Sequence, residues 1–130
     1  MLLQIRKANA EDAPQLAELL RDIGWFDSIK SEPMEVATRR VRLHTERCLA
    51  DDSHSIFVAE EPDGTIVGYG SVHWLPYLFL QGPEGYVSEL FVRDSARGQG
   101  VGRALLQNIE AEARARGCAR LSLITNQFII

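Results

Sequence analysis

The sequence predicts an α/β protein, more strictly α+β, in which helices flank a mixed, mostly antiparallel central sheet. Three observations lead to this fold class. Two strand-like segments are joined by turn residues, two helical segments precede them, and a later strand runs through a glycine-rich loop into a helix. The chain has 130 residues, 45% of them hydrophobic. This length and composition suffice for one buried core, but the chain is too short for two. We therefore expect one domain over residues 1–130.

The first predicted elements are a strand and a helix. Residues 3–7 alternate apolar and polar side chains, as a half-buried strand does. The stretch 9–12 combines an N-cap asparagine with acidic residues in the first turn, so it predicts a helix start. The helix should run to about Ile23 and stop at Gly24. Its apolar face comprises Leu16, Leu19, Leu20 and Ile23.

A second helix is expected from Pro33, because proline fits the first helical position. Its apolar positions are Val36, Val41, Leu43 and Leu49. The densest basic group of the chain, Arg39, Arg40 and Arg42, lies in the same segment, where helical spacing favours a solvated face over a binding patch. With a net charge of −4 and no longer basic run, nucleic acid is not an expected partner.

An antiparallel hairpin is expected next, from strands 55–60 and 66–74 around the turn residues 62–65. Gly68 and Gly70 weaken the second strand, so they indicate a bulge or a close backbone approach. The loop 75–85 that follows is unusually apolar. Its residues Tyr77, Leu78, Phe79 and Leu80 either pack under the sheet or cover a substrate mouth, two alternatives that stay open.

The last predicted elements form a strand–loop–helix–strand unit. A strand over 86–93 leads into the glycine loop, a helix over 101–116 leaves it, and Gly117 ends that helix. The strand 121–124 should return parallel to the first through a right-handed crossover. The helix has one apolar stripe against the sheet, formed by Val101, Ala104, Leu105, Ile109 and Ala113.

The loop Arg97-Gly-Gln-Gly-Val-Gly102 has the composition of a phosphate cradle. Glycines at 98, 100 and 102 remove Cβ atoms that would hold an anion away, and the first helical turn leaves N–H groups unpaired. A Walker loop is excluded, because Arg103 and Ala104 stand where that loop needs lysine and a hydroxyl residue. The G-x-G-x-G spacing also differs from the G-x-G-x-x-G of dinucleotide-binding folds.

The pattern Arg97-x-x-Gly100-x-Gly102, directly after a strand Leu90-Phe-Val92, resembles the acetyl-CoA motif of the GNAT superfamily of N-acetyltransferases. The resemblance extends over about residues 3–126, although Asp94 stands where many members carry a proline. It implies that acetyl-CoA places its pyrophosphate on the loop amides and its pantetheine arm along the strand. The cofactor-binding residues implied are Leu90, Phe91, Val92, Arg97, Gly98, Gln99, Gly100, Val101, Gly102 and Asn126.

Members of the superfamily usually continue from the position of Asn126 into another helix and two strands. This sequence ends four residues later with 127–130, so we expect a C-terminally shortened version of the fold. Its last strand would then expose an edge beside an apolar tail, a state prone to pairing with another chain. A homodimer through that edge is the expectation.

Acetyl transfer to an amine requires loss of a proton from the amine, a polarised thioester carbonyl and protonation of the leaving thiolate. Glu89 is the preferred general base; an electrostatic anchor for a cationic acceptor and a surface position on the strand stay open. Glu84 is a second candidate base, in a Gly/Pro loop. The resemblance implies that a backbone N–H near Phe91 or Val92 polarises the carbonyl. No general acid is assigned among Ser88, Tyr69 and Tyr86.

The predicted function is therefore an N-acetyltransferase that uses acetyl-CoA and a primary amine of a small molecule, amino acid or peptide. The alternative is a catalytically incomplete acetyl-CoA-binding module whose site a partner chain or dimer completes. The two differ in turnover, since both would bind CoA.

Neither a disulfide nor a metal site is indicated. Cys48 and Cys118 are far apart in unlike contexts. The histidines at 44, 54 and 73 share no ligand spacing with cysteines or carboxylates, so no metal is expected. The N-terminus has no signal peptide or membrane-spanning stretch, so we expect a cytoplasmic protein without a membrane partner.

Overall fold

The computed structural model describes residues 2–24 and 30–123. One strand is followed by two helices, three consecutive strands, a helix and a last strand, as the sequence predicts. In chain order they are β1 (Gln4–Lys7), the 3-10 turn η1 (Ala10–Asp12), α1 (Ala13–Ile23), α3 (Met34–Asp51), β2 (His54–Glu60), β3 (Ile66–Leu75), β4 (Glu84–Val92), the 3-10 turn η2 (Asp94–Ala96), α4 (Val101–Ala115) and β5 (Arg120–Leu123).

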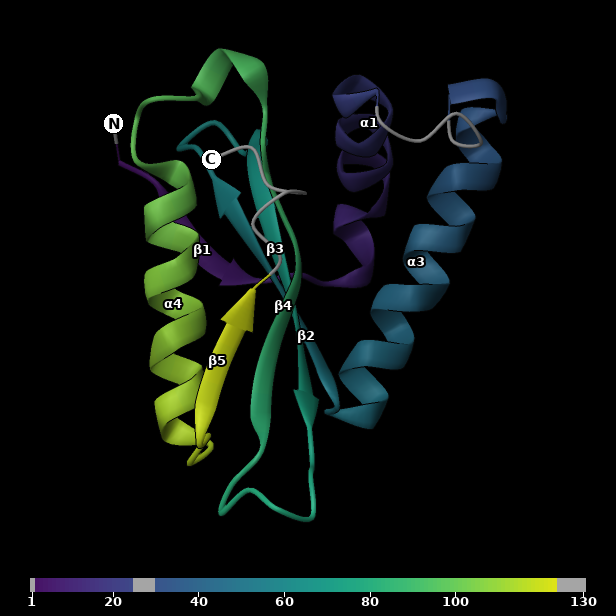
Figure 1. The fold of residues 1–130 in the computed structure, drawn as a ribbon. Helices are drawn as coiled ribbons and strands as arrows, with labels where there is room; N and C mark the ends of the chain where they lie inside the picture. Colours follow the sequence, from purple (N-terminus) through teal and green to yellow (C-terminus); the bar gives the residue numbers. More distant parts are fainter. Residues whose placement is uncertain (1, 25–29, 124–130) are drawn as a thin grey trace.

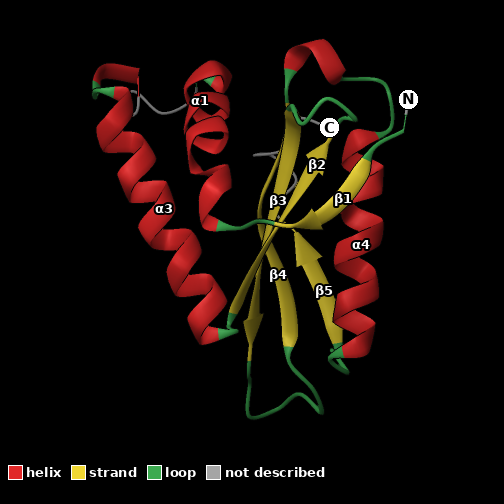
Figure 2. Cartoon of the chain, turned by 180° about the vertical axis from the view of Figure 1, so that it is seen from behind, coloured by secondary structure: helices red, strands yellow, loops and turns green. Residues whose placement is uncertain are grey.

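The strands form one sheet in the order β1-β2-β3-β4-β5. Every neighbouring pair is antiparallel except β4 and β5, which run parallel on either side of α4 in the sequence. Helix α4 covers one face of the sheet, and α1 and α3 cover the other (Figures 1 and 2). The predicted mixed, mostly antiparallel sheet between helices is confirmed.

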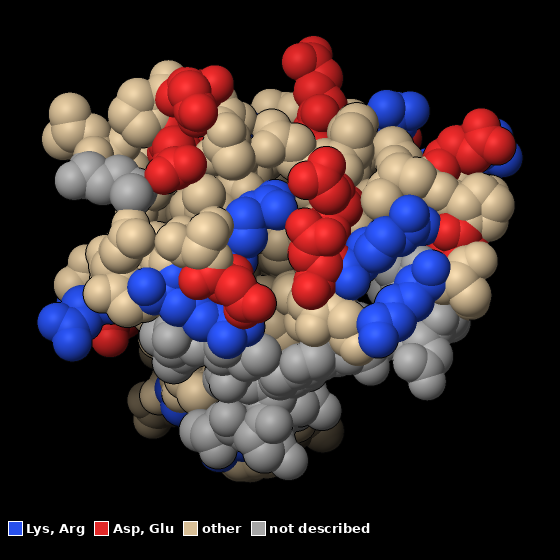
Figure 3. All heavy atoms as spheres, turned by 90° about the horizontal axis from the view of Figure 1, so that it is seen from above, with Lys and Arg blue, Asp and Glu red and all other residues tan. Residues whose placement is uncertain are grey.

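Charged side chains of both signs surround the end of the molecule that carries η2. Seen from that end, lysine and arginine lie interspersed with aspartate and glutamate (Figure 3). The view contains no continuous basic surface among the described residues. The arginines 39, 40 and 42 are exposed on α3, and Arg40 donates to the Glu32 carboxylate.

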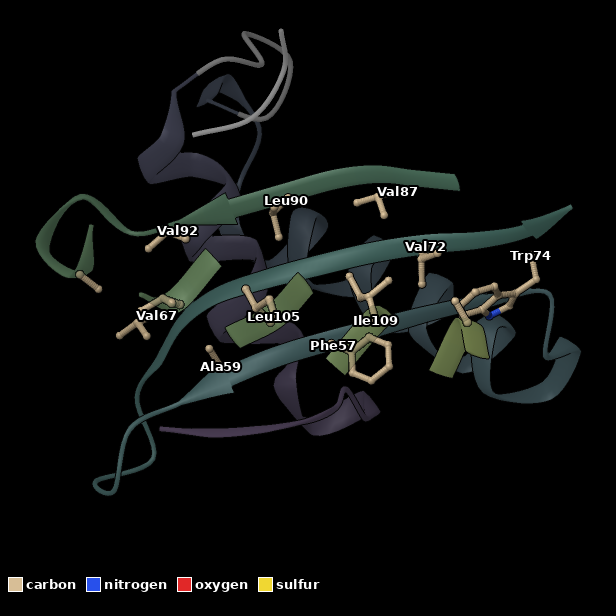
Figure 4. Packing of buried hydrophobic residues seen from close by; sticks show 13 residues of the cluster. Phe57, Ala59, Val67, Val72, Trp74, Val87, Leu90, Val92, Leu105 and Ile109 are labelled. Atoms are coloured by element: carbon tan, nitrogen blue, oxygen red, sulfur yellow. The ribbon is translucent and has the colours of Figure 1, made fainter. Parts of the chain in front are cut away.

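The face of the sheet under α4 holds the larger apolar core. Leu105 and Ile109 of α4 are fully buried between side chains of β2, β3 and β4 (Figure 4). Each such burial is worth about 1.5–3 kcal/mol of transfer free energy. The predicted stripe of α4 is confirmed at Val101, Leu105, Ile109 and Ala113, whereas Ala104 is only half-buried.

The glycines of β3 lie directly under this helix. A Cβ added to Gly68 would come within 2.9 Å of the Phe91 carbonyl oxygen and 3.1 Å of Val101 Cγ1. A Cβ on Gly70 would meet Ile109 Cδ1 at 3.0 Å. The sequence-based expectation of close approach is confirmed, and a bulge also occurs nearby, at Ser71/Val72.

The second core lies between the sheet and the N-terminal helices. Leu16 and Leu19 of α1 pack against Val58, Tyr69 and Phe91. The predicted apolar face of α3 is wrong in part, because Val36, Leu43 and Leu49 are exposed while Val41 packs against this core. Only Ala37 and Thr45 of α3 are buried. The helix therefore uses a narrow strip of small side chains toward α1 and β2.

The helix ends follow the expected local chemistry with small shifts. Asn9 and Asp12 form a capping box, which opens the 3-10 turn η1 before the α-helix begins. Gly24 ends α1 with φ of 75°, in the left-handed region. Pro33 is the N-cap of α3 rather than its first helical residue.

The apolar loop between β3 and β4 lies at the opposite end of the sheet from η2 (Figure 1). Tyr77, Leu78 and Phe79 are exposed there, so they do not pack under the sheet. The Arg120 guanidinium lies over the rings of Tyr77 and Phe79.

Both cysteines are free thiols. Among the described helices, none has the length and apolar character needed to span a membrane.

Candidate active site

The loop between β4 and α4 is built around two glycines in the left-handed region. Gly98 has φ of 78° and Gly100 has φ of 83°, and open space surrounds the position of an added Cβ at both. Gly102 lies buried in the first turn of α4. Left-handed backbone is unfavourable for residues with a Cβ, so the sequence supplies glycine where the chain must turn sharply.

The N-terminus of α4 opens into a cavity of about 260 Å³. No side chain caps this helix, so its first N–H groups are available to an anion. The positive end of the helix dipole adds to the attraction of negative charge. The cavity is lined by Val92, Ala96, Arg97, Gly98, Gly100, Val101, Gly102 and Arg103.

Arg97 shapes this loop. Its Nη2 lies 2.6 Å from Asp94 Oδ1, and its Nε donates to the carbonyl of Val92 at 3.4 Å. The Asp94 that replaces the family's usual proline thus holds the arginine. Arg103 is a second exposed cation that lines the cavity, from the first turn of the helix.

The end of β4 nearest this loop is open along one edge. Within the described residues, β5 pairs with β4 only from Glu84 to Val87. The Arg93 N–H donates across to Val67 on β3. Because successive residues of a strand turn their N–H groups to alternate edges, those of Leu90 and Val92 face the open edge. The resemblance implies that an N–H near Phe91 or Val92 polarises the thioester carbonyl. Of these two N–H groups, that of Val92 lies on the open edge.

Glu89 faces the other side of the sheet, toward α1 and α3. It borders a cavity of about 230 Å³ whose other walls are mostly apolar. The cavity is lined by Leu16, Leu20, Arg40, Val41, His44, Thr45, Ile56, Tyr69, Ser71 and Glu89. A carboxylate on the wall of a mostly apolar cavity is a natural place for a cationic or proton-donating ligand.

Tyr69 fixes the Glu89 carboxylate. The Tyr69 hydroxyl donates to Glu89 Oε1 at 2.8 Å. Burial raises the pKa of Tyr69 well above its ordinary value, and the adjacent Glu89 charge and this hydrogen bond raise it further. The phenol therefore keeps its proton and remains a donor to the carboxylate.

Glu84, the second candidate base, is not in a loop as predicted. It begins β4, is 6% exposed, and accepts from Arg120 and from Ser122 Oγ on β5. These bonds hold β5 against β4, at the end of the strand away from the glycine loop. Glu84 is thus engaged in the sheet and lies apart from Glu89.

The remaining polar residues of the site differ in their surroundings. His73 Nε2 and Ser88 Oγ are hydrogen-bonded at 3.0 Å, and burial lowers the pKa of His73. Trp74 is buried, and its indole N–H donates to Ser55 Oγ, so it packs in the core. Tyr86 is half-buried, with its ring near that of His73.

The structure therefore brings the loop residues 97–102 together and places Glu89 on the strand that leads to them. From Glu89 to Val92 the strand rises about 10 Å.

Asn126 lies outside the described residues. Sequence reasoning missed Arg103 and the Tyr69–Glu89 hydrogen bond. Only the first had a local signal, as a cation in the first turn after the loop.

The fold and the site together define a class of protein that binds a phosphate-bearing cosubstrate on a strand–glycine loop–helix unit. Comparison with known sequences makes this specific: residues 17–128 match the Acetyltransferase (GNAT) family. The chain belongs to that family. The prediction of an N-acetyltransferase enzyme is thereby confirmed.

Individual relatives agree with this assignment. The chain is 34% identical to the L-methionine sulfoximine/L-methionine sulfone acetyltransferase of Pseudomonas aeruginosa, over 90% of this chain and 67% of that protein. It is 33% identical to an aminoglycoside N(6')-acetyltransferase type 1 of Stenotrophomonas maltophilia, over 91% and 72%. Among solved structures, a transcriptional regulator from Bacillus halodurans C-125 is similar with a TM-score of 0.80 and 27% identity, over 95% and 81% of the two chains.

Proposed function

We propose that this protein transfers the acetyl group of acetyl-CoA to the primary amine of a small molecule about the size of an amino acid. One observation carries the proposal. Strand β4 leads through the glycine loop into the uncapped N-terminus of α4, and its residue Glu89 lines the cavity under α1 and α3. The edge of β4 between these two places is not paired with β5. The family and its N-acetyltransferase relatives favour this enzyme over a module that only binds acetyl-CoA.

On the donor side, acetyl-CoA supplies an activated acyl group as a thioester. The residues present fit its pyrophosphate, because Gly98 and Gly100 leave room above the backbone and the α4 N-terminus offers free N–H groups. Arg103 adds a positive charge to the same cavity. At the open edge of β4, the N–H of Val92 is free of β5 and is placed to donate to the thioester carbonyl oxygen of acetyl-CoA.

On the acceptor side, Glu89 accepts a proton from the amine, directly or through water. An alkylammonium has an ordinary pKa of about 10.4, so it must lose a proton before it can attack a carbonyl. Tyr69 orients the carboxylate through its 2.8 Å hydrogen bond. The C–N bond then forms as the C–S bond breaks, and the thiolate takes up a proton.

The size of the cavity favours a small acceptor over a peptide. Its volume of about 230 Å³ lies below the roughly 300–1,000 Å³ of pockets for drug-sized ligands. Leu16, Leu20 and Val41 would contact an apolar acceptor body, while Glu89 meets the amine. Arg40 at the rim could pair with an acceptor carboxylate if it left Glu32.

The test is release of CoA thiol from acetyl-CoA with a panel of amines that includes amino acids, an aminoglycoside and a lysine peptide. We expect turnover with an amino-acid-sized amine and a loss of about 10²–10⁴-fold in kcat for Glu89→Gln. Glu46→Gln, an exposed change on α3, is the matched control and should leave the rate unchanged. No turnover with any amine, at intact CoA affinity, would favour the binding module.

The same variant separates a base from an anchor. If Glu89 only anchored a cationic acceptor, Glu89→Gln would raise KM and leave kcat unchanged. If Glu89 is the base, kcat falls. The two roles thus give different kinetic signatures in one experiment.

A homodimer remains part of the proposal. β5 is the last strand of the described sheet, with four residues, and an edge strand offers unpaired backbone groups to a second copy. Light scattering at micromolar concentration tests this, and a monomeric mass would overturn it. The acetyl-transfer proposal does not depend on the outcome.

A further inference from the structure

Three potential metal ligands converge at the acceptor cavity, which His44 also lines. His44 and Cys48 lie one helical turn apart on α3, and His54 begins β2. One ligand atom from each lies within 4.8 Å of the others. Cys48 Sγ and His54 Nδ1 are 3.2 Å apart. Spacing along the chain gave no indication of a metal, but the fold brings an i, i+4 pair of α3 close to His54 of β2.

We propose that His44, Cys48 and His54 bind a divalent ion of the zinc type. Two imidazole nitrogens and one thiolate are a donor set that suits zinc and excludes the hard cations Mg²⁺ and Ca²⁺, which prefer oxygen ligands. Binding releases the proton of the Cys48 thiol to solvent, since the thiolate is the ligand.

The surroundings of His54 provide a second observation. Its Nε2 is hydrogen-bonded to Ser71 Oγ, and its ring stacks on that of His73 at 4.0 Å between centroids. With the proton on Nε2 and donated to Ser71, Nδ1 turns its lone pair toward Cys48. Metal-bound histidines are commonly oriented in this way, with the second ring nitrogen donating to a fixed acceptor.

The distances allow an ion with small side-chain movements. Tetrahedral zinc with bonds of about 2.3 Å to sulfur and 2.0 Å to nitrogen separates these two ligands by roughly 3.6 Å. The Cys48–His54 separation is within about 0.4 Å of this value. His44 is exposed, so its ring can rotate toward the pair.

A fourth coordination position has space. Cys48, His54 and Thr45 border a cavity of about 150 Å³ on the side of the cluster next to β1. That volume is more than a water molecule requires. The proposed site therefore has three protein ligands and one position for solvent, and it would join the last turns of α3 to β2. His44 and Thr45 also line the acceptor cavity, so the ion would hold one of its walls.

The experiment titrates Co²⁺, and then Zn²⁺, into metal-free full-length protein under reducing conditions. We expect one Co²⁺ per chain with a sulfur-to-cobalt charge-transfer band, displaced by Zn²⁺. The band should vanish in Cys48→Ser and persist in the matched control Cys118→Ser, whose half-buried thiol lies elsewhere in the fold. His44→Ala changes an exposed side chain, so it should fold normally while losing roughly tenfold or more in affinity.

Three results would overturn the proposal. One is a parent protein without a sulfur-to-cobalt band at saturating Co²⁺. The second is a band that survives in Cys48→Ser, and the third is an affinity that His44→Ala leaves unchanged. Any of them would leave the Cys48–His54 contact as an ordinary hydrogen bond inside the fold. CoA binding is not involved in these readouts, so they test the metal site independently of acetyl transfer.

Discussion

Glu89 and Tyr69 show how a site side chain gains its position from a neighbouring strand. Tyr69 lies opposite Phe91 in the β3–β4 register, and Glu89 lies opposite Ser71, so the tyrosine and the glutamate are diagonal neighbours. Side chains in that relation can reach each other when one is long and aromatic. The sheet thus supplies the base with a fixed proton donor.

Replacing Tyr69 with phenylalanine should test this positioning role. The cavity keeps its shape, but the carboxylate loses its donor, so we expect kcat to fall about tenfold, less than in Glu89→Gln. Loss of one hydrogen bond should cost about 0.5–1.5 kcal/mol of stability. Steady-state kinetics and urea unfolding measure both effects. An unchanged kcat would mean that Tyr69 only packs in the core.

The surroundings of Asp12 lead to a prediction about how the stability of the fold depends on pH. Its carboxylate accepts hydrogen bonds from Nη1 and Nη2 of Arg6, each at 2.8 Å, and from the Asn9 N–H. Burial alone would raise the pKa of Asp12, but these hydrogen bonds outweigh it and hold the pKa below its usual value. A carboxylate with a lowered folded-state pKa stabilises the fold above its unfolded-state pKa, and this contribution is lost as the pH falls through the folded value.

Asp12→Asn should therefore destabilise the protein at neutral pH by about 1–3 kcal/mol, through lost pairing and capping. The difference between parent and variant should shrink below about pH 3.8, where Asp12 of the parent begins to be protonated in the unfolded chain. Urea unfolding across pH measures it. A difference that stays constant down to pH 2 would contradict the ionic origin of the effect.

The sequence predicted part of the site and missed the rest for a physical reason. The cradle was predictable because Gly98 and Gly100 act locally, each allowing a turn where it stands. Glu89 was predictable from its place before that strand end. The contact with Tyr69, and the meeting of His54 with His44 and Cys48, depend on strand register and helix docking. Neither follows from spacing along the chain.

At the scale of the elements, α4 packs closely on β3. Gly68 and Gly70 let the helix approach the sheet, and they differ in what an added methyl group would meet. At Gly68 it meets the fixed carbonyl oxygen of Phe91, whereas at Gly70 it meets the ends of the Ile109 and Leu90 side chains. A backbone atom cannot move aside as a side-chain end can.

Gly68→Ala should therefore destabilise the protein more than Gly70→Ala. We expect about 1–3 kcal/mol for the first, from overpacking, and less for the second. Both variants replace a glycine of the same strand by alanine, so the change in conformational entropy of the unfolded chain is the same in each. Chemical denaturation measures the two values. The reverse order would show that α4 shifts easily on the sheet.

The element that the sequence described least well is α3. Its larger apolar residues Val36, Leu43 and Leu49 suggested a buried face, but the helix buries Ala37 and Thr45 instead. The Thr45 hydroxyl donates to the Val41 carbonyl, so a polar residue can be buried at no cost in hydrogen bonding. By contrast, α1 and α4 have large leucines and isoleucines facing the sheet, and their faces were predicted correctly.

At the scale of the whole molecule, one sheet separates two apolar cores. Phe57 and Leu90 belong to the core under α4, while Val58 and Phe91 belong to the core under α1, so neighbouring residues of one strand enter different cores. Disrupting either core must distort the shared strands. The proposed single domain over residues 1–130 should thus unfold as one unit.

Thermal unfolding followed by far-ultraviolet and near-ultraviolet circular dichroism tests this expectation. The two signals should give one coincident transition. Two resolved transitions would contradict a single cooperative unit and would separate the helices α1 and α3 from the sheet.

The central claim is that the loop from Arg97 to Gly102 binds the pyrophosphate of CoA, and calorimetric titration with CoA tests it most directly. Gly100→Val places a branched side chain in the cradle, and Gly64→Val is the matched control, at a half-buried hairpin glycine that has φ of 92° and open space around an added Cβ. Both changes impose similar backbone strain, but only the first lies in the proposed site. We predict CoA binding in the parent and in Gly64→Val, and a loss of at least about tenfold in Gly100→Val, some 1.4 kcal/mol. Equal CoA affinity in all three proteins would contradict the claim.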